Sequence, residues 1–154
     1  LMTQPDECID TDQPARPMAR LEQILDNFPN HIISIEMKGP GSASMAPFLD
    51  LLDTYDRKDR IIIQMFAGGQ SQLTQAKARG YTTWANAFDE EITDHPEWFG
   101  SNVDLVGLNW DATDEQWEAA VSYGKPTIGH VIGSLAQALT AISQGANGLT
   151  ISRW

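Results

Sequence analysis

Short apolar runs alternate with amphipathic segments along most of the chain, and this alternation constrains the fold more than any other feature. Six runs rich in β-branched residues recur about every 23 residues and predict buried strands. A regular alternation of strands and helices predicts parallel strands joined by right-handed crossovers. The predicted strands lie at 31–38, 60–66, 81–87, 103–109, 126–132 and 148–154.

The segments between the strands carry apolar residues at spacings of three and four, which is typical of amphipathic helices. Local signals support some of their ends. Thr113 and Gln116 form a capping box that opens one helix, and Gly80 and Gly145 stand where helices commonly end. The predicted helices lie at 18–28, 45–55, 71–79, 113–124 and 134–144, and a broken helix is predicted at 89–99.

Two architectures accept this pattern: an open, doubly wound sheet and a (β/α)-barrel. An eight-unit barrel at this period needs roughly 190 residues or more, whereas this chain has 154. A six-stranded open sheet would fit by length alone. The pattern of strands and helices therefore leaves both architectures open.

Composition and charge narrow the range of partners. The chain has 10 basic and 21 acidic side chains and a net charge of −11. Such a surface repels phosphate backbones and argues against nucleic acid as a partner. No apolar run approaches the roughly 18 residues of a membrane helix, which predicts no membrane span. Cys8 is the single cysteine, so an internal disulfide and a multi-cysteine zinc site are excluded.

The first segment of the chain differs from the rest. Residues 1–17 have no apolar periodicity and are rich in proline and acidic residues, so they predict an arm or loop before a barrel-like domain at 18–154. The opening of the chain is polar and acidic, unlike a signal peptide. If Leu1 lies near the natural N-terminus, this favours the cytoplasm.

Five segments resemble, in order, motifs of the glycerophosphodiester phosphodiesterase family. Residues 16–25 are similar to the family's "P-x-L-x-E-x-L" helix, and the sequence ISIEMK at 33–38 is similar to its "IEIK" strand. Residues 63–66 resemble its "x-x-S-F" strand end, 124–133 its "G-x-x-V-x-x-W-T-V-N" and 144–153 its "x-G-V-D-G-I-I-T-D-R". Together these segments span nearly the whole chain from residue 14 onward.

The sequence departs from the family at several motif positions. Met65 stands where serine is usual, His130 replaces the tryptophan, Gly133 replaces an asparagine and Ser152 replaces an aspartate. The first thirty residues contain no histidine, although the family's first two strands carry an "H-R" motif, "E-x-D" metal ligands and a second histidine.

The resemblance implies an incomplete α/β barrel of the TIM type, with about six parallel strands alternating with helices. These strands would match the family's strands three to eight, and its first two strands and last helix would be lacking. The implied activity is the hydrolysis of a phosphodiester, and we expect this chain alone to be weakly active or inactive. Two alternatives remain: a degenerate, non-catalytic binding module on the same fold, and an unrelated six-stranded open α/β protein.

Glu36 and Lys38 are the leading candidates for a functional site. They lie two residues apart on one strand, so their side chains point to the same face. A carboxylate there could bind a hard cation, and a lysine could hold a phosphate. The resemblance implies that Glu36 is a metal ligand and that Lys38 contacts the substrate. One carboxylate alone predicts weak binding of Mg²⁺ or Ca²⁺ at best, and the alternative is an exposed ion pair.

Four further residues are candidates. His130 lies near the end of a strand and could act as a general acid or base, or be purely structural. Phe66 and Trp110 could line the substrate cleft or pack in the core. Arg153 could bind a phosphate through its guanidinium group, or belong to a frayed terminus. The expected ligand is a phosphodiester or another phosphate-bearing small molecule.

An incomplete barrel would expose the strands at 31–38 and 148–154 as edges with unpaired backbone groups. We expect these edges to pair with another copy, giving a homo-oligomer, or to be covered by residues 1–17.

Overall fold

The computed structural model describes residues 19–38 and 45–152. Contacts divide the chain into two units, Leu1–His31 and Ile32–Trp154. The arm expected at residues 1–17 lies outside the described residues. The described part of the first unit contains one helix, α1 (Leu21–Asn27), which confirms a helix within 18–28. Phe28 contacts His31 edge-to-face, with the ring centroids 5.4 Å apart.

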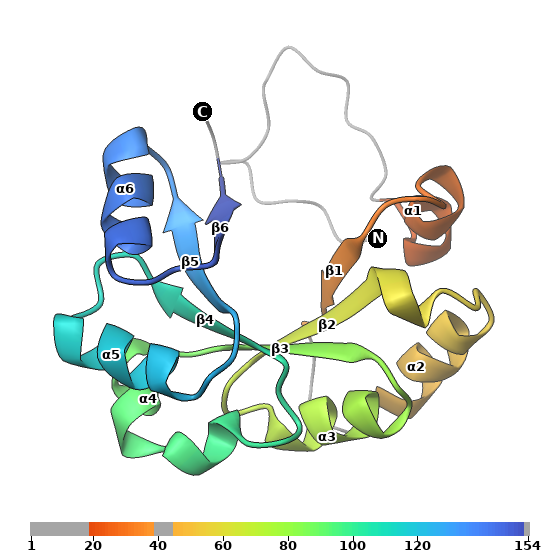
Figure 1. Ribbon diagram of the computed structural model, residues 1–154. Helices are drawn as coiled ribbons and strands as arrows, with labels where there is room; N and C mark the ends of the chain where they lie inside the picture. Colours follow the sequence, from red (N-terminus) through yellow and green to blue (C-terminus); the bar gives the residue numbers. More distant parts are fainter. Residues whose placement is uncertain (1–18, 39–44, 153–154) are drawn as a thin grey trace. The chain divides into compact units, whose positions relative to one another are not determined.

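The second unit is built on a six-stranded parallel sheet (Figure 1). The strands follow one another across the sheet in chain order, and every adjacent pair is parallel. The sheet curves into an open half-barrel, which confirms the incomplete barrel predicted above. Its strands are β1 (Ile33–Glu36), β2 (Ile61–Phe66), β3 (Thr82–Asn86), β4 (Leu105–Asn109), β5 (Thr127–Ile132) and β6 (Gly148–Ile151).

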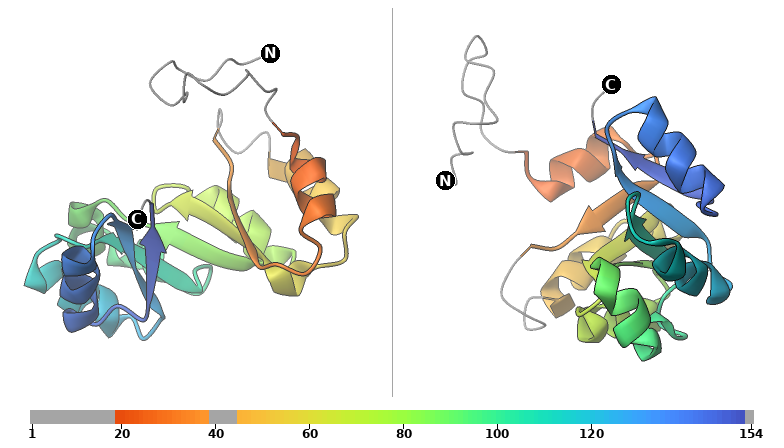
Figure 2. Two further views of the ribbon diagram at one scale, coloured as in Figure 1. Left: turned by 90° about the horizontal axis from the view of Figure 1, so that it is seen from above. Right: turned by 90° about the vertical axis from the view of Figure 1, so that its left-hand side faces the viewer.

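Helices cover the convex side of the sheet, and the concave side carries none of the described helices of this unit (Figures 1 and 2). No described helix is long and apolar enough to cross a membrane. The broken helix predicted at 89–99 is confirmed: it is divided in two, because Pro96 lacks the N–H that would continue the hydrogen-bond ladder. The elements are α2 (Met45–Asp53), η3 (Lys58–Arg60), α3 (Gln70–Ala78), α4 (Asp89–Asp94), η4 (Pro96–Phe99), α5 (Asp114–Ser122) and α6 (Leu135–Ser143).

The predicted helix ends have the expected local structure. The Thr113 hydroxyl accepts a hydrogen bond from the Gln116 backbone N–H at 3.3 Å, and the Thr113 N–H donates to the Gln116 side chain at 2.9 Å. Gly80 and Gly145 follow α3 and α6 with φ angles of 86° and 109°, a region that favours glycine.

The core lies between the outer face of the sheet and the helices. Trp117 on α5 is its largest fully buried side chain and is only 1% exposed. Glycine at position 129 allows α6 to come close, since a Cβ atom there would lie 2.8 Å from Ala141 Cβ. The other large and fully buried apolar side chains of this unit are Met45, Leu49, Leu52, Ile61, Ile63, Leu73, Tyr81, Ile92, Phe99 and Leu108.

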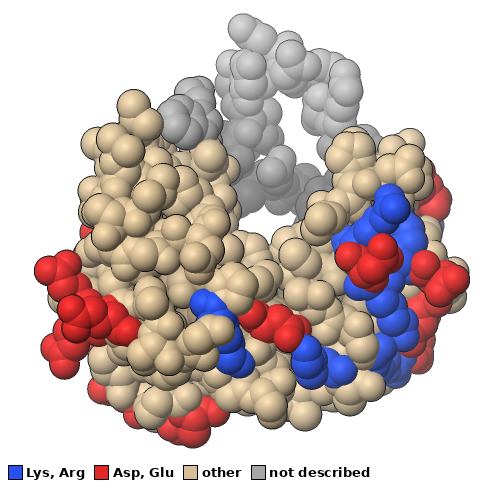
Figure 3. Space-filling model, viewed as in Figure 1, with Lys and Arg blue, Asp and Glu red and all other residues tan. Residues whose placement is uncertain are grey.

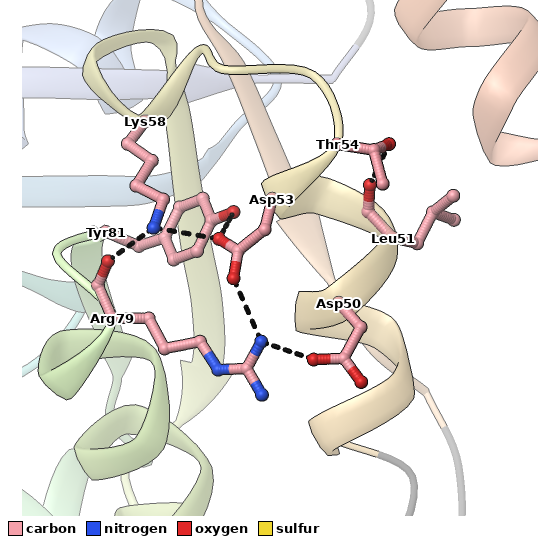
Figure 4. Close-up of polar contacts among 7 residues, drawn as sticks. All are labelled: Asp50, Leu51, Asp53, Thr54, Lys58, Arg79 and Tyr81. Atoms are coloured by element: carbon pink, nitrogen blue, oxygen red, sulfur yellow. Dashed lines mark hydrogen bonds and ion pairs between the residues drawn. The ribbon is translucent and has the colours of Figure 1, made fainter.

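A group of charged side chains links α2, α3 and the starts of β2 and β3 (Figure 4). Asp53 accepts hydrogen bonds from Lys58 at 2.8 Å, the Tyr81 hydroxyl at 2.7 Å and Arg79 at 2.9 Å. Arg79 also contacts Asp50 at 2.6 Å. We refer to these five residues as the Asp53 cluster. In the space-filling view, the basic side chains on this side of the molecule lie directly against acidic ones (Figure 3).

The Asp53 carboxylate accepts hydrogen bonds from three side chains. The hydrogen bonds from Lys58 and then from Tyr81 lower the pKa of the Asp53 carboxyl to about 2. Burial, followed by the hydrogen bond to Asp53, raises the pKa of the Tyr81 hydroxyl. Such ion pairs at the amino-terminal ends of barrel strands are typical of the face that stabilises the fold.

The Asp53 cluster predicts a specific dependence of stability on pH. The pKa of Asp53 is lower in the folded chain than its ordinary value, so its stabilising effect is complete above about pH 4 and is lost as the pH falls towards 2. Asp53→Asn should therefore lower the free energy of unfolding at pH 7. The difference from the unmodified chain should shrink between about pH 4 and 2 in chemical denaturation.

Asp50→Asn is the matched control, because Asp50 is on the same helix and contacts the same arginine but its side chain is 67% exposed. It should cost less stability than Asp53→Asn at pH 7. Equal losses in the two variants, or a loss for Asp53→Asn that is the same at pH 2 and pH 7, would contradict this role.

Candidate functional site: the concave face of the sheet

Strand register places a band of polar side chains on the concave face. Side chains alternate along each strand, and the pairing sets Glu36 beside Gln64, Gln64 beside Trp84, and Asn109 beside His130. Gly107 lies beside Asn86 in the sheet, and a Cβ atom on Gly107 would meet the side chains of Asn86 and Trp84 and no helix. This confirms that Asn86 and Trp84 point to the face of the sheet opposite the helices. We call this band the concave polar face: Glu36, Gln64, Trp84, Asn86, Asn109 and His130.

Glu36 and Lys38 come together at one side of this face, as their spacing predicts. The Lys38 ammonium lies 2.6 Å from the Glu36 carboxylate and 5.0 Å from the centre of the Phe66 ring. The side chain of Lys38 is 71% exposed and that of Glu36 is 21% exposed. The structure thus brings three predicted site residues into contact at the carboxyl ends of β1 and β2. The Lys38 ammonium group remains accessible to a ligand.

Two aromatic rings form an apolar rim beside Lys38. Phe66 stacks on Phe88, with the ring centroids 4.8 Å apart and the planes within 6° of parallel. Both remain exposed, Phe66 by 38% and Phe88 by 55%. Phe66 therefore lies at the surface of the concave face and is not a core aromatic.

The described residues do not provide a complete metal site. Glu36 is held by Lys38, and no group of three or more His, Cys, Asp or Glu side chains in the described part of the chain could hold a metal ion. Ca²⁺ takes six to eight oxygen ligands and Mg²⁺ near-octahedral coordination. One paired carboxylate does not meet either requirement, so we derive no chemical step through a metal.

His130 lies at the other side of the concave polar face, close to Asp89. Burial lowers the pKa of the His130 imidazole, while the Asp89 carboxylate and the Gly107 backbone partly oppose this shift. Asp89 also accepts a hydrogen bond from the Asn109 side chain at 2.8 Å. The lowered pKa of His130 favours a neutral imidazole near pH 7, which can accept a proton.

Three polar atoms of this face are buried and have no hydrogen-bond partner among the described residues. They are Trp84 Nε1, Asn86 Oδ1 and His130 Nε2. Trp84 and Asn86 are only 8% and 7% exposed. Most buried polar groups in folded proteins are hydrogen-bonded, so each of these atoms needs an explanation.

Two other predicted site residues are not among the residues that the structure places on this face. Trp110 follows β4 and packs against the buried core between the sheet and the helices, while its backbone N–H donates to the His130 carbonyl at 3.0 Å. Its role in a cleft stays a prediction. Arg153 lies outside the described residues.

Trp84, Asn86 and Asn109 are candidate residues that the sequence analysis missed. The available signal was their alternation with Thr83, Ala85, Val106 and Leu108, which all point to the core side. Polar residues at the ends of buried strands are typical of barrel active sites.

Comparisons with known proteins support the fold. No protein-family model matches the chain, and no curated protein matches it. Among solved structures, the chain is similar to one from Silicibacter pomeroyi DSS-3 described as a "putative glycerophosphoryl diester phosphodiesterase". The TM-score is 0.55 at 17% sequence identity. The match covers 70% of this chain and 39% of that one, so it spans well under half of that protein. At this level of identity the similarity shows the fold alone. The fold agrees with the incomplete barrel that the sequence motifs imply.

Position 107 should accept no side chain. A Cβ atom there would lie 2.0 Å from Asn86 Oδ1 and 2.6 Å from Trp84 Nε1. Gly107→Ala should therefore displace both side chains and lower the free energy of unfolding by about 1–3 kcal/mol, measured by denaturant titration.

Gly68→Ala is the control, because its Cβ atom would meet nothing closer than Trp98 at 3.9 Å. It should change stability little. If Gly107→Ala is as well tolerated as this control, the packing of Asn86 and Trp84 over Gly107 is not as described.

Proposed function

We propose that this chain is a glycerophosphodiester phosphodiesterase-like protein whose concave face binds a phosphate-bearing small molecule at Lys38. We further propose that the chain alone hydrolyses phosphodiesters weakly or not at all. The observation that carries the proposal is the contact of Lys38 with Glu36 and Phe66 at the carboxyl ends of β1 and β2. Ligands bind at this end of the strands in barrels of this type.

Lys38 can exchange its partner at low cost. Ion pairs between exposed side chains contribute only about 0–1 kcal/mol to stability, and the Lys38 side chain is largely exposed. A phosphodiester carries one negative charge, as the Glu36 carboxylate does, and its two free oxygens can accept hydrogen bonds from the ammonium in place of that carboxylate. Phe66 and Phe88 would then cover the apolar part of the ligand.

Hydrolysis requires more functional groups at the site than binding does. It needs a base that activates water and an acid that protonates the leaving group. His130 is the histidine that strand register places on the concave face, and as a neutral imidazole it can serve as the base. The carboxyl group near it, Asp89, accepts a hydrogen bond from Asn109 and is not assigned the role of proton donor, which supports weak turnover at most. Binding without turnover would favour the non-catalytic alternative.

Substitution of Lys38 tests the binding part of the proposal. Lys38→Ala should weaken the binding of glycerophosphocholine by about tenfold or more, as read by calorimetry. Arg20→Ala is the control, because Arg20 is also exposed and also pairs with a glutamate, but it precedes α1 in the first unit. Equal affinity in the unmodified chain and in Lys38→Ala would refute a phosphate site at Lys38.

An activity assay with Mg²⁺ or Ca²⁺ tests the second part. We expect little or no release of glycerol phosphate from glycerophosphocholine by well-folded protein. Any turnover should be abolished by Glu36→Ala and by Lys38→Ala. Rapid turnover that survives both substitutions would show that the chemistry takes place elsewhere on the chain.

We also propose that the chain forms a homo-oligomer through its strand edges. Among the described strands, β1 and β6 each pair on one side only. Next to β6, α6 exposes Leu135, Leu139 and Ile142 by more than half of their surface. Sedimentation should show a dimer or larger species that Leu139→Glu dissociates, and a monomer at all concentrations would refute this proposal.

A further inference from the structure

A groove between the start of α5 and the end of α6 points to a binding site on the helix side of the sheet. Its volume is about 360 Å³, and the residues that line it are Asp114, Trp117, Glu118, Ser143 and Gln144. We propose that this groove binds an arginine side chain of a peptide through its guanidinium group. The groove shares no residue with the proposed phosphate site, and the inference does not depend on that proposal.

The first argument is the charge of this side of the molecule. Between Arg79 and Lys125 the chain has ten acidic and no basic side chains. In the space-filling view, acidic side chains gather where α5 lies, with no basic side chain among them (Figure 3). Asp114 and Glu118 are exposed, and neither forms an ion pair with another described residue. Both carboxylates are therefore available to a positively charged ligand.

The second argument is the end of α6, which forms the other wall of the groove. The carbonyl groups at the C-terminus of a helix carry partial negative charge and favour a cation nearby. The last turn of α6 contains no basic residue that could supply one. A cation in the groove would therefore be attracted both by the carboxylates of α5 and by the carbonyl end of α6.

The third argument is a pair of polar atoms without partners. Trp117 is only 1% exposed, yet its Nε1 has no hydrogen-bond partner in the described part of the chain, and neither has Gln144 Oε1. The far edge of the indole faces the sheet, where Cη2 lies 3.6 Å from the position of a Cβ atom on Gly129. The pyrrole part of the ring, which carries Nε1, therefore lies towards α5 and the floor of the groove. A buried donor and a buried acceptor beside one groove indicate that a ligand completes them.

The chemistry of the groove selects the ligand. The carboxylates of Asp114 and Glu118 and the Gln144 Oε1 atom all accept hydrogen bonds, and a guanidinium group offers five donors in a planar fork. The Gln144 amide is held by two long hydrogen bonds, 3.4 Å to the Ala112 carbonyl and 3.2 Å to Asp114, so it can turn Oε1 towards a ligand. Trp117 Nε1 can only donate, and a peptide carbonyl next to the arginine would accept from it.

Calorimetric titration of the full chain with N-acetyl-arginine amide tests the proposal. We expect saturable binding, and binding of N-acetyl-citrulline amide weaker by about tenfold or more, because citrulline has the same shape without the charge. Free arginine should also bind more weakly, since its carboxylate would meet the acidic side chains. No saturable binding, or equal affinity for the citrulline compound, would overturn the site. Tighter binding of free arginine or of N-acetyl-lysine amide would overturn the ligand class.

Glu118→Gln locates the site, and Glu115→Gln is its matched control. Both side chains are exposed and lie on α5, but Glu115 does not line the groove. Both variants should therefore keep the melting temperature of the unmodified chain. Glu118→Gln should weaken the binding of N-acetyl-arginine amide by about tenfold, and Glu115→Gln by less than about twofold. Equal losses in the two variants would show attraction to the acidic surface as a whole and would refute the groove.

NMR of the ¹³C,¹⁵N-labelled full chain distinguishes this site from the concave face. N-acetyl-arginine amide should shift the indole N–H signal of Trp117 saturably and leave that of Trp84 unchanged. A shift at Trp84 with Trp117 unaffected would place the ligand on the concave face and overturn the inference. Lys38→Ala should keep full affinity for N-acetyl-arginine amide while losing affinity for phosphate-bearing ligands, and loss of both would contradict two separate sites.

Discussion

Close packing of the sheet against its helices is the constraint on which the other features depend. Trp117 and Ala141 press against the outer face, where Gly129 leaves them room. Because side chains alternate along a strand, the outward position of Thr83 and Ala85 forces Trp84 and Asn86 onto the concave face. A shift of one residue in a strand would exchange the two sets, so the core fixes the site.

The amino and carboxyl ends of the strands differ in how their polar side chains are paired. At the amino ends, Asp53 is paired with Lys58, Arg79 and Tyr81, and Asp104 is paired with Lys77 and Thr83 further along. At the carboxyl ends, Lys38 is exposed and three buried polar atoms have no partner among the described residues. Groups that lower the stability of a folded chain are typical of places where a ligand completes the structure.

Much of the fold could be predicted from the sequence, because strand and helix periods differ and turns carry clear signals. The contact of Glu36 with Lys38 could also be predicted, since a spacing of two places both side chains on one face. The role of Asn86 could not. Thr83, on the same strand, is polar but is buried on the core side and bonded to Asp104, which obscures the alternation of apolar and polar residues along β3. The approach of Asn86 to Gly107 also depends on the register between two strands, which no local pattern specifies.

The central claim is that ligands bind this chain on the concave face at the carboxyl ends of its strands. Mapping backbone amide shifts during titration with glycerophosphocholine tests it most directly. We expect the largest changes at the ends of β1, β2 and β3, around Lys38, Phe66 and Asn86, and none around Asp53 and Tyr81. Changes centred on the amino ends or on the outer helices, with the concave face unaffected, would contradict ligand binding on the concave face.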